Sequence, residues 1–448
     1  MDHGGQGADG TKATGGPRGG HRALSGADAL TALSGRPDGP GLEPPPRLVE
    51  SVEQLGIEWG RRSALLGVGA PVDPMRLLVE RAALTGLRRL GDVSCGGSAR
   101  LLRSADGWLA VNLARHDDWD LVDAWLQPDR PIRPGQWAAV ATGVAGLGNA
   151  ALVSRSALLG LPVSALGERN GRATPPRSRP IGALGMEGVR AHRYRPGPPA
   201  VLDGLVVVDL SALWAGPLAA GLLAAAGARV VKVESWGRPD GARLGSRAFF
   251  SGLNDRKESV ALDFATADGR RRLGELVSSA DVVVSAARPR ALEQLGLVPD
   301  DHPRRGGSRV WLSVTGYGWS GRAAQRVAFG DDAAVAGGLV VWDDEGPCFC
   351  GDAIADPLSG ITGAVAVLAA LERGGGWSVD VSMADVSAGC SGAGTTMIAT
   401  GPVTRPTAVP EPSGPELGGL QGNRLPQTAP APALGADTNS VLASLGIR

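Results

Sequence analysis

Hydrophobic residues in the second half of the chain follow two patterns that alternate. Short apolar runs such as 205–210 (LVVVDL) and 281–286 (DVVVSA) predict strands buried inside a parallel sheet. Stretches with apolar residues every three or four positions, such as 217–228 and 265–280, predict helices. Over 201–399 this alternation predicts an α/β fold, with an open, mostly parallel, Rossmann-like sheet and helices on both faces.

Residues 46–170 show a different pattern, which predicts a smaller α+β domain. Segments 51–66 and 75–90 each carry a Leu-rich face at helical spacing. Segment 101–113 (LLRSADGWLAVNL) predicts a β-hairpin that turns at Asp106-Gly107.

The remaining segments are rich in Gly and Pro. We expect residues 1–45 to be a disordered tail, because they lack the apolar content to pack. Residues 171–200, rich in Arg, Pro and Gly, predict a linker. Residues 400–448 predict a Pro-rich extended segment that ends in a short helix at NSVLASLGI.

Charge and targeting signals narrow the class of protein. The chain has 45 basic and 45 acidic residues, so we expect no general attraction to nucleic acid or to a membrane surface. It has neither a signal-peptide pattern nor an apolar run of about 18 residues or more. A soluble cytoplasmic protein is the expectation.

Histidine and cysteine are both scarce. None of the 5 histidines falls in the strongly periodic core of the second half, because His302 lies in a polar connecting segment, and this disfavours a Ser-His or Cys-His hydrolase. Cys348 and Cys350 alternate along one segment, but no further Cys or His follows at zinc-ligand spacing. We therefore expect reduced structural thiols and no metal site.

Asp356 is the main candidate for a catalytic residue. Pro357 follows it, and an apolar run at helical spacing begins there, which is a typical helix start. Asp356 is either the N-cap of this helix or a carboxylate nucleophile. In both cases the helix N-terminus favours its ionised form.

Two further positions suggest an anionic ligand. The polar turn Asn254 to Lys257 holds one of only three lysines, and it is either a solvated loop or a phosphate contact. Arg288 follows a buried strand, at the sheet edge where open α/β folds bind ligands. Glu234 ends the strand where a dinucleotide-binding fold has its ribose acid, but no G-x-G-x-x-G precedes it, so NAD is not expected.

Six stretches in order resemble the family III CoA-transferases. They are VVVDLSALWAGPLAAGLLAAAGARVVKVE, FFSGLNDRKESVALDF, ADVVVSAARPRALEQLGL, LSVTGYGWSG, GDAIADPLSGITGAVAVLAAL and VDVSMADV, which together cover roughly 200 to 390. The family includes formyl-CoA transferase, carnitine CoA-transferase and the α-methylacyl-CoA racemases.

The resemblance implies a reaction and a site. It makes Asp356 the catalytic carboxylate, which forms an acyl-aspartyl anhydride and then an aspartyl-CoA thioester as CoA passes from an acyl-CoA to a carboxylic acid. Backbone N–H groups at Gly330 or Gly337-Gly338 are candidate oxyanion donors. The resemblance also implies a homodimer, with CoA as the only cofactor, and it places contacts to CoA at Trp214, Ala215, Ser235, Asn254, Lys257, Ala287, Arg288, Phe329 and Gly330.

The sequence also departs from the family pattern. Trp214 stands where the formyl-CoA transferase group commonly has Gln, Ser235 where Arg is usual, and Gly330 where that group is acidic. These changes leave a catalytically inactive CoA-binding paralogue as one alternative. A 2-methylacyl-CoA racemase is another, although the histidine that it needs is missing and only Asp331 or Asp332 could replace it.

The order of the segments is unusual as well. The family's insertion after VSMADV is nearly absent here. Stretches in the N-terminal block, ADGWLAVNLA and LLGLPVSALG, look like the family's small domain and later sequence. A rearranged two-copy architecture accounts for this order.

Overall fold

The central element is a seven-stranded sheet in which six strands run parallel. The structure is a computed structural model that describes residues 25–170, 186–297, 310–392 and 429–448. The strand order is β4-β12-β9-β8-β5-β6-β7, and β4 alone is antiparallel to its neighbour. The strands are β4 (Val189–Arg195), β5 (Val206–Asp209), β6 (Arg229–Ser235), β7 (Lys257–Leu262), β8 (Val282–Ser285), β9 (Val310–Thr315) and β12 (Gly376–Ser382). The predicted α/β fold is confirmed.

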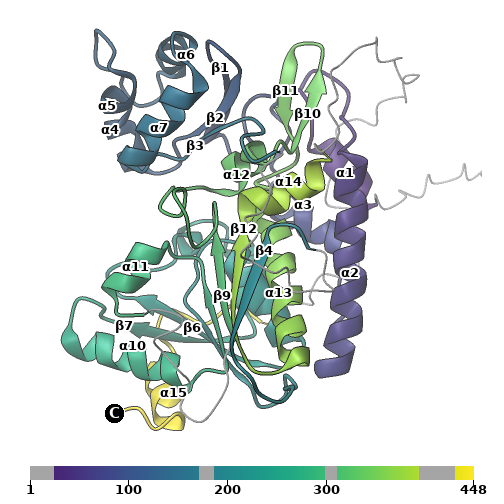
Figure 1. The fold of residues 1–448 in the computed structure, drawn as a ribbon, viewed down its shortest axis with the longest axis vertical. Coiled ribbons are helices and arrows are strands. Elements are labelled where there is room, and N and C mark those ends of the chain that lie inside the picture. Colours follow the sequence, from purple (N-terminus) through teal and green to yellow (C-terminus); the bar gives the residue numbers. More distant parts are fainter. Residues whose placement is uncertain (1–24, 171–185, 298–309, 393–428) are drawn as a thin grey trace, which may run out of the picture.

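Helices cover both faces of this sheet because successive strand residues point to opposite sides. Val207 packs on one face with α8 (Ala215–Ala225) and α13 (Ala355–Arg373), whereas Val208 packs on the other with α10 (Ala267–Ser279). The C-terminal helix α15 (Thr438–Ser444), expected from the sequence, joins the second face (Figure 1).

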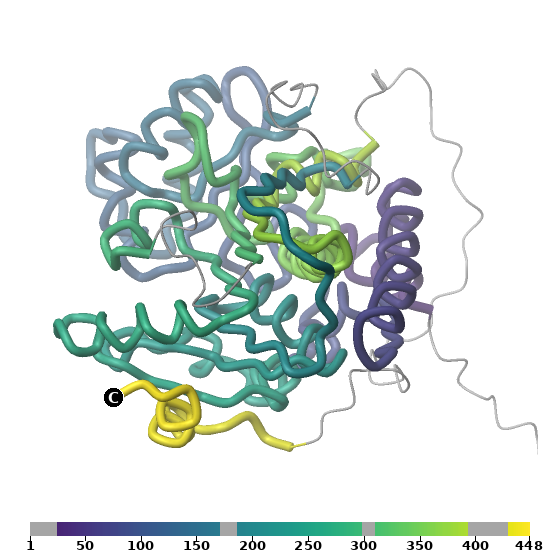
Figure 2. The backbone as a smooth tube through the Cα atoms, turned by 60° about the horizontal axis from the view of Figure 1, so that its bottom comes forward, coloured from purple at the N-terminus to yellow at the C-terminus, as the bar shows by residue number. Residues whose placement is uncertain are grey.

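Helix α13 lies at the centre of the molecule. Every residue from Pro357 to Leu371 is buried, because α8, α2 (Pro46–Leu66) and the sheet surround the helix. Figure 2 views α13 nearly end-on, with α2 beside it. Within the described residues α13 alone is long and apolar enough to span a bilayer, and 89% of that apolar window is buried inside the protein.

The N-terminal block is divided between two cores. Helices α1 (Gly26–Ala32), α2 and α3 (Pro74–Thr85) pack into the same core as the sheet. A separate unit, at the upper left of Figure 1, has its own core around Trp125 and Leu152. It consists of the antiparallel sheet β1 (Ala99–Arg103), β2 (Trp108–Asn112) and β3 (Val163–Ala165) with helices α4 (His116–Asp120), α5 (Val122–Leu126), α6 (Trp137–Ala145) and α7 (Asn149–Leu159).

The predicted domain at 46–170 therefore needs a different boundary, since its first helices belong to the large core. The hairpin at Asp106-Gly107 forms as expected, with the Ser104 N–H donating to the Gly107 carbonyl at 2.9 Å. The predicted helix at 75–90 ends at Thr85, because Gly86 adopts a left-handed φ of 69°.

Two segments expected to be irregular are ordered elements. Within the predicted disordered tail, Ser25 and Asp28 form a capping box and start α1, which buries Leu30 against α3. Within the predicted linker, residues 189–195 form β4 and pair with β12. Residues 1–24, 171–185 and 393–428, which include much of the remainder of these predicted segments, lie outside the described residues.

The remaining elements connect the sheet to the site. They are the 3-10 helix η1 (Gly241–Leu244), α9 (Arg247–Asn254), α11 (Pro289–Gln294), α12 (Gly330–Ala336), the hairpin β10 (Val340–Asp343) and β11 (Gly346–Phe349), and α14 (Met383–Ser391).

Candidate active site

A strained turn delivers Asp356 to the start of α13. The helix begins at Ala355, so Asp356 is its second residue and not the N-cap that the sequence suggested. Ala353, two residues before the helix, has φ +44°, a left-handed conformation that a residue with a Cβ adopts only when its surroundings enforce it. The Asp331 carboxylate enforces it by accepting the Ala353 N–H at 3.0 Å, and the Ala353 carbonyl accepts the Asp356 N–H at 2.9 Å.

Gly330 lies directly against the Asp356 carboxylate. Its backbone N–H donates to that carboxylate. A Cβ at this position would lie 2.5 Å from Asp356 Oδ2, so only glycine leaves room for the contact. The N–H groups of Gly337 and Gly338 donate instead to carbonyls at the end of α12, which leaves Gly330 as the donor on Asp356 among the candidates from the sequence.

Three carboxylates and one guanidinium form the core of the site. Asp331, Asp352 and Asp356 are close enough to influence one another electrostatically, and Arg81 of α3 is their cationic neighbour. Arg81 Nε donates to Asp352 Oδ2 at 2.7 Å, and its Nη2 donates to Oδ1 of the same carboxylate. Sequence reasoning missed both Arg81 and Asp352.

The environment of Asp356 changes its protonation. Burial raises the pKa of Asp356 to about 7; the Arg81 charge opposes the rise, Asp331 and Asp352 add to it, and the Gly330 N–H opposes it. The residue as a whole keeps some solvent exposure. The expected preference for the ionised form is therefore wrong, because a helix N-terminus contributes only about 0.3–1 kcal/mol, less than the burial it must offset.

Asp331 and Asp332, the two residues that the sequence offered as substitute bases, both accept hydrogen bonds from neighbouring elements. Burial also raises the pKa of Asp331 to about 7, but one of its oxygens holds the Ala353 N–H. Asp332 accepts the Phe329 N–H at 3.0 Å and the Asn112 side chain at 3.1 Å. Asp332 thus joins α12 to β2 of the small unit.

The first β-α loop contributes Trp214 and Ala215 next to this cluster. Trp214 is 3% exposed and its ring lies 5.2 Å from the Arg81 guanidinium, a cation–π distance. Its indole Nε1 has no hydrogen-bond partner in the described part of the chain. A Cβ on Gly360 of α13 would meet the Ala215 carbonyl at 2.7 Å, which places Ala215 one turn along α13 from Asp356.

Lys257 and Asn254 are buried and make contacts within the protein. Lys257 is 4% exposed, and its Nζ lies 2.8 Å from Asp209 Oδ2 and 2.8 Å from the Pro217 carbonyl. Asn254 is buried and donates to the Phe250 carbonyl at 2.9 Å. Lys257 is therefore not in a solvated loop, and its charge is paired with Asp209 in the interior, while the phosphate contact stays a prediction.

Arg288 is exposed at the N-terminus of α11, at the carboxyl edge of the sheet. Its pKa is lowered by partial burial and by the positive charges of Arg115, Arg238 and Arg290, so four arginines share this region. Ser235 ends β6 and Ala287 follows β8, and both lie along the same edge. The predicted CoA contacts thus fall into a group at Asp356 and a group at this edge.

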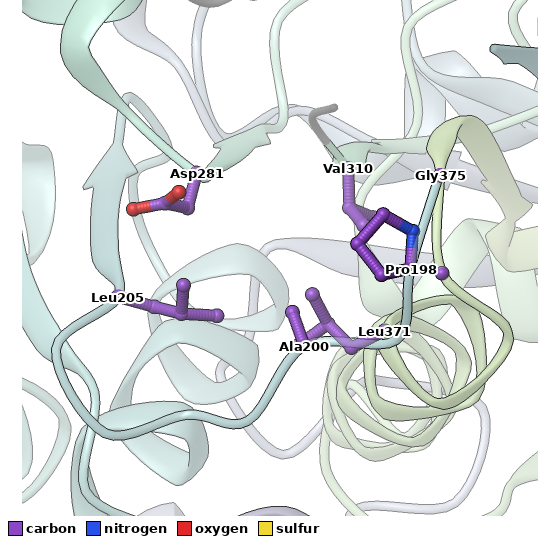
Figure 3. Close-up of a pocket in the computed structure, with 8 residues that line it drawn as sticks. Pro198, Ala200, Leu205, Asp281, Val310, Leu371 and Gly375 are labelled. Atoms are coloured by element: carbon purple, nitrogen blue, oxygen red, sulfur yellow. The ribbon is translucent and has the colours of Figure 1, made fainter. Parts of the chain in front are cut away.

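A small hollow lies away from this site (Figure 3). It is lined by Leu205, Asp281 and Val310 at the beginnings of β5, β8 and β9, and by Gly374 at the far end of α13 from Asp356. Its volume of about 40 Å³ holds one or two water molecules and no nucleotide.

Metal-ligand side chains are dispersed. Among the described residues no group of three or more His, Cys, Asp or Glu side chains is arranged to hold a metal ion. All four cysteines are buried free thiols.

Comparisons with known proteins converge on one group. Residues 202–438 match the sequence profile of CoA-transferase family III. The chain is 35% identical over 207 residues to a probable fatty acyl-CoA transferase of Mycobacterium tuberculosis, covering 43% of this chain and 52% of that protein. It is 31% identical over 200 residues to a succinyl-CoA–D-citramalate CoA-transferase of Chloroflexus aurantiacus, covering 42% and 50%.

A solved structure of a CaiB/BaiF family protein from Brucella suis is 30% identical, covers 43% of this chain and 55% of that chain, and superposes with a TM-score of 0.39. The chain spans about half the length of the curated relatives it matches. Asp356 lies inside the profile-matched region and Arg81 lies outside it.

Proposed function

The chain belongs to CoA-transferase family III, and from this membership we propose that it transfers CoA from an acyl-CoA thioester to a carboxylic acid through Asp356. The observation that carries the proposal is the placement of Asp356. A strained turn presents its carboxylate, the Gly330 N–H donates to it, and its pKa of about 7 allows it to be ionised near neutral pH.

The reaction divides one difficult exchange into several easier ones. The ionised Asp356 carboxylate attacks the thioester carbonyl, which forms a mixed anhydride and releases CoA thiolate. The thiolate attacks the aspartyl carbonyl, which forms an aspartyl-CoA thioester and releases the donor acid. The acceptor carboxylate then displaces CoA thiolate to form a second anhydride, and thiolate attack on its acyl carbon yields the new acyl-CoA and free Asp356.

Gly330 suits these steps because its donor already lies on the reacting group. When thiolate attacks the aspartyl carbonyl, negative charge develops on an Asp356 oxygen. The Gly330 N–H, which donates to the carboxylate before reaction, stabilises this oxyanion without reorganisation. The missing acidic side chain at position 330 is thus compatible with catalysis.

The two groups of predicted contacts suit the two ends of CoA. We propose that Trp214, Ala215, Phe329 and Gly330 receive the thiol end beside Asp356. Arg288 lies at the carboxyl edge near Ser235 and Ala287, where it shares a positive field with Arg238, Arg290 and Arg115, and such a field favours the phosphates of the nucleotide end.

The names of the two relatives suggest donors for a first screen, namely fatty acyl-CoA and succinyl-CoA. We also propose a homodimer in the cytoplasm, on the likeness to the family alone.

Intact-protein mass spectrometry tests the proposal. Wild type and Asp356→Asn are incubated briefly with a panel of acyl-CoAs that includes both donors. A CoA-sized or acyl-sized adduct on wild type alone supports the proposal, and the most reactive donor defines the substrate class. CoA binding with no adduct from any donor overturns it; exchange of the α-proton with deuterated water would then indicate a racemase, and no exchange an inactive paralogue.

A further inference from the structure

Arg81 is the one cation that acts on the Asp356 cluster in the described structure, and it comes from outside the family-matched region. It lies on α3, 271 residues before its partner Asp352. Asp352 is fully buried, whereas the Arg81 side chain keeps 29% exposure. The pairing uses two nitrogens on two oxygens, which fixes the carboxylate in orientation as well as in distance.

This pairing fixes the turn that carries Asp356. Asp352 immediately precedes Ala353, the residue in the left-handed conformation. Arg81 holds the turn through the Asp352 side chain, and Asp331 holds it through the Ala353 N–H at 3.0 Å. The turn is therefore clamped from α3 on one side and from α12 on the other.

Arg81 has a second effect, which is on the ionisation of Asp356. The groups that act on Asp356 are Arg81 of α3, Asp331 and the Gly330 N–H at the start of α12, and Asp352 on its own turn. Both carboxylates disfavour its ionisation, and Arg81 favours it. Without Arg81, three carboxylates would share one partly desolvated site, an arrangement that opposes ionisation of all of them.

We propose that Arg81 is a positioning residue for Asp356: it holds the turn through Asp352 and favours the ionised nucleophile. The proposal rests on the proposed function of Asp356 as nucleophile. The proposal gives a residue of the N-terminal block, Arg81, a role in the site. The Arg81 guanidinium lies over the indole ring of Trp214, which stands where the formyl-CoA transferase group commonly has a polar Gln.

Three variants separate charge from geometry. Arg81→Gln removes the charge and the fork, Arg81→Lys keeps the charge without the fork, and Arg88→Gln removes an exposed arginine just beyond α3 as a matched control. Each is assayed for the rate of adduct formation against pH with the most reactive acyl-CoA donor.

We expect Arg81→Gln to raise the midpoint of that pH profile by about one pH unit or more, which corresponds to about fivefold less ionised carboxylate at pH 7, or a greater loss for a larger rise. Arg81→Lys should keep the midpoint within about half a unit but lower the plateau rate, since lysine is a point charge and cannot grip both oxygens. Arg88→Gln should match wild type. An unchanged midpoint and plateau in Arg81→Gln would overturn the proposal.

A second readout does not require turnover. Aspartate labelled with ¹³C at the carboxyl carbon gives an Asp356 signal that is assigned by its loss in Asp356→Asn. Its titration midpoint should rise in Arg81→Gln and stay unchanged in Arg88→Gln. If wild type forms no adduct, the proposed function fails, but this titration still decides whether Arg81 sets the state of Asp356.

If Arg81→Gln does not fold, Arg81→Gln/Asp352→Asn replaces it, because this double variant also removes the buried carboxylate with which Arg81 forms its ion pair. Because Arg81 acts on Asp356 more strongly than Asp352 does, the double variant should still show a smaller rise in the titration midpoint. No rise would overturn the proposal.

Discussion

Replacing Asp356 by Asn should stabilise the protein, and the gain should grow with pH. The folded protein binds the Asp356 proton more tightly than the unfolded chain does, because the pKa is about 7 in the structure against about 3.9 for an unperturbed aspartate. Between these two values the folded state holds the proton and the unfolded state loses it. Folding stability therefore falls as pH rises through this window, and Asp356→Asn removes that fall.

The size of the effect follows from the same two values. Each pKa unit is worth 1.36 kcal/mol, so the full difference sets an upper bound of about 4 kcal/mol above pH 7. Asp356 is partly exposed, and screening by solvent reduces the figure. We expect Asp356→Asn to raise the free energy of unfolding by about 2 kcal/mol near pH 8 and by about half as much near pH 5.5.

Urea denaturation followed by tryptophan fluorescence at both pH values measures the difference. Asp344→Asn, at an exposed position beyond β10, is the matched control and should show no such pH dependence. A stability difference for Asp356→Asn that is independent of pH, or a loss of stability near pH 8, would refute the assignment of a buried carboxylate with a raised pKa.

Three further predictions follow from the contacts. Gly330→Ala should displace both the Ala353 carbonyl of the turn and the Asp356 carboxylate, because a Cβ would overlap them, and it should slow adduct formation by about tenfold or more while CoA still binds, as stopped-time mass spectrometry and calorimetry would measure. Lys257→Met should destabilise the protein by about 3–5 kcal/mol in urea, because it leaves Asp209 charged and buried, and Asp209→Asn/Lys257→Met should recover most of the loss. Arg288→Glu should weaken CoA binding by about tenfold or more and flatten its salt dependence in calorimetry, whereas unchanged binding would remove Arg288 from the site.

The strands that the sequence predicted well are those buried on both faces. An apolar run such as that of β8 has few alternatives to a central parallel strand, so its hydrophobicity alone identifies it. Strand β4 reads VRAHRYR, which is polar because it lies at the sheet edge with its side chains partly in solvent. Its place depends on pairing with β12, which local composition does not report.

Prediction of the site residues was limited in the same way, because local sequence does not report contacts between distant segments. Asp356 was found because Asp-Pro before an apolar run is a local signal, and the family resemblance strengthened it. Lys257 was misjudged because its burial depends on Asp209, 48 residues away. Arg81 carries no local signal, since an arginine on an amphipathic helix is ordinarily solvated, and only the fold brings it to Asp352.

The most direct test of the account follows an oxygen atom from acceptor to enzyme. In the proposed route the acceptor carboxylate forms an anhydride with Asp356, and thiolate attack on the acyl carbon leaves one acceptor oxygen on the enzyme. With an acceptor acid labelled with ¹⁸O, the peptide that contains Asp356 should gain one heavy oxygen in a single turnover, and fragmentation should place it on Asp356. Labelled acceptor converted to its CoA thioester with no heavy oxygen on Asp356 would contradict the account.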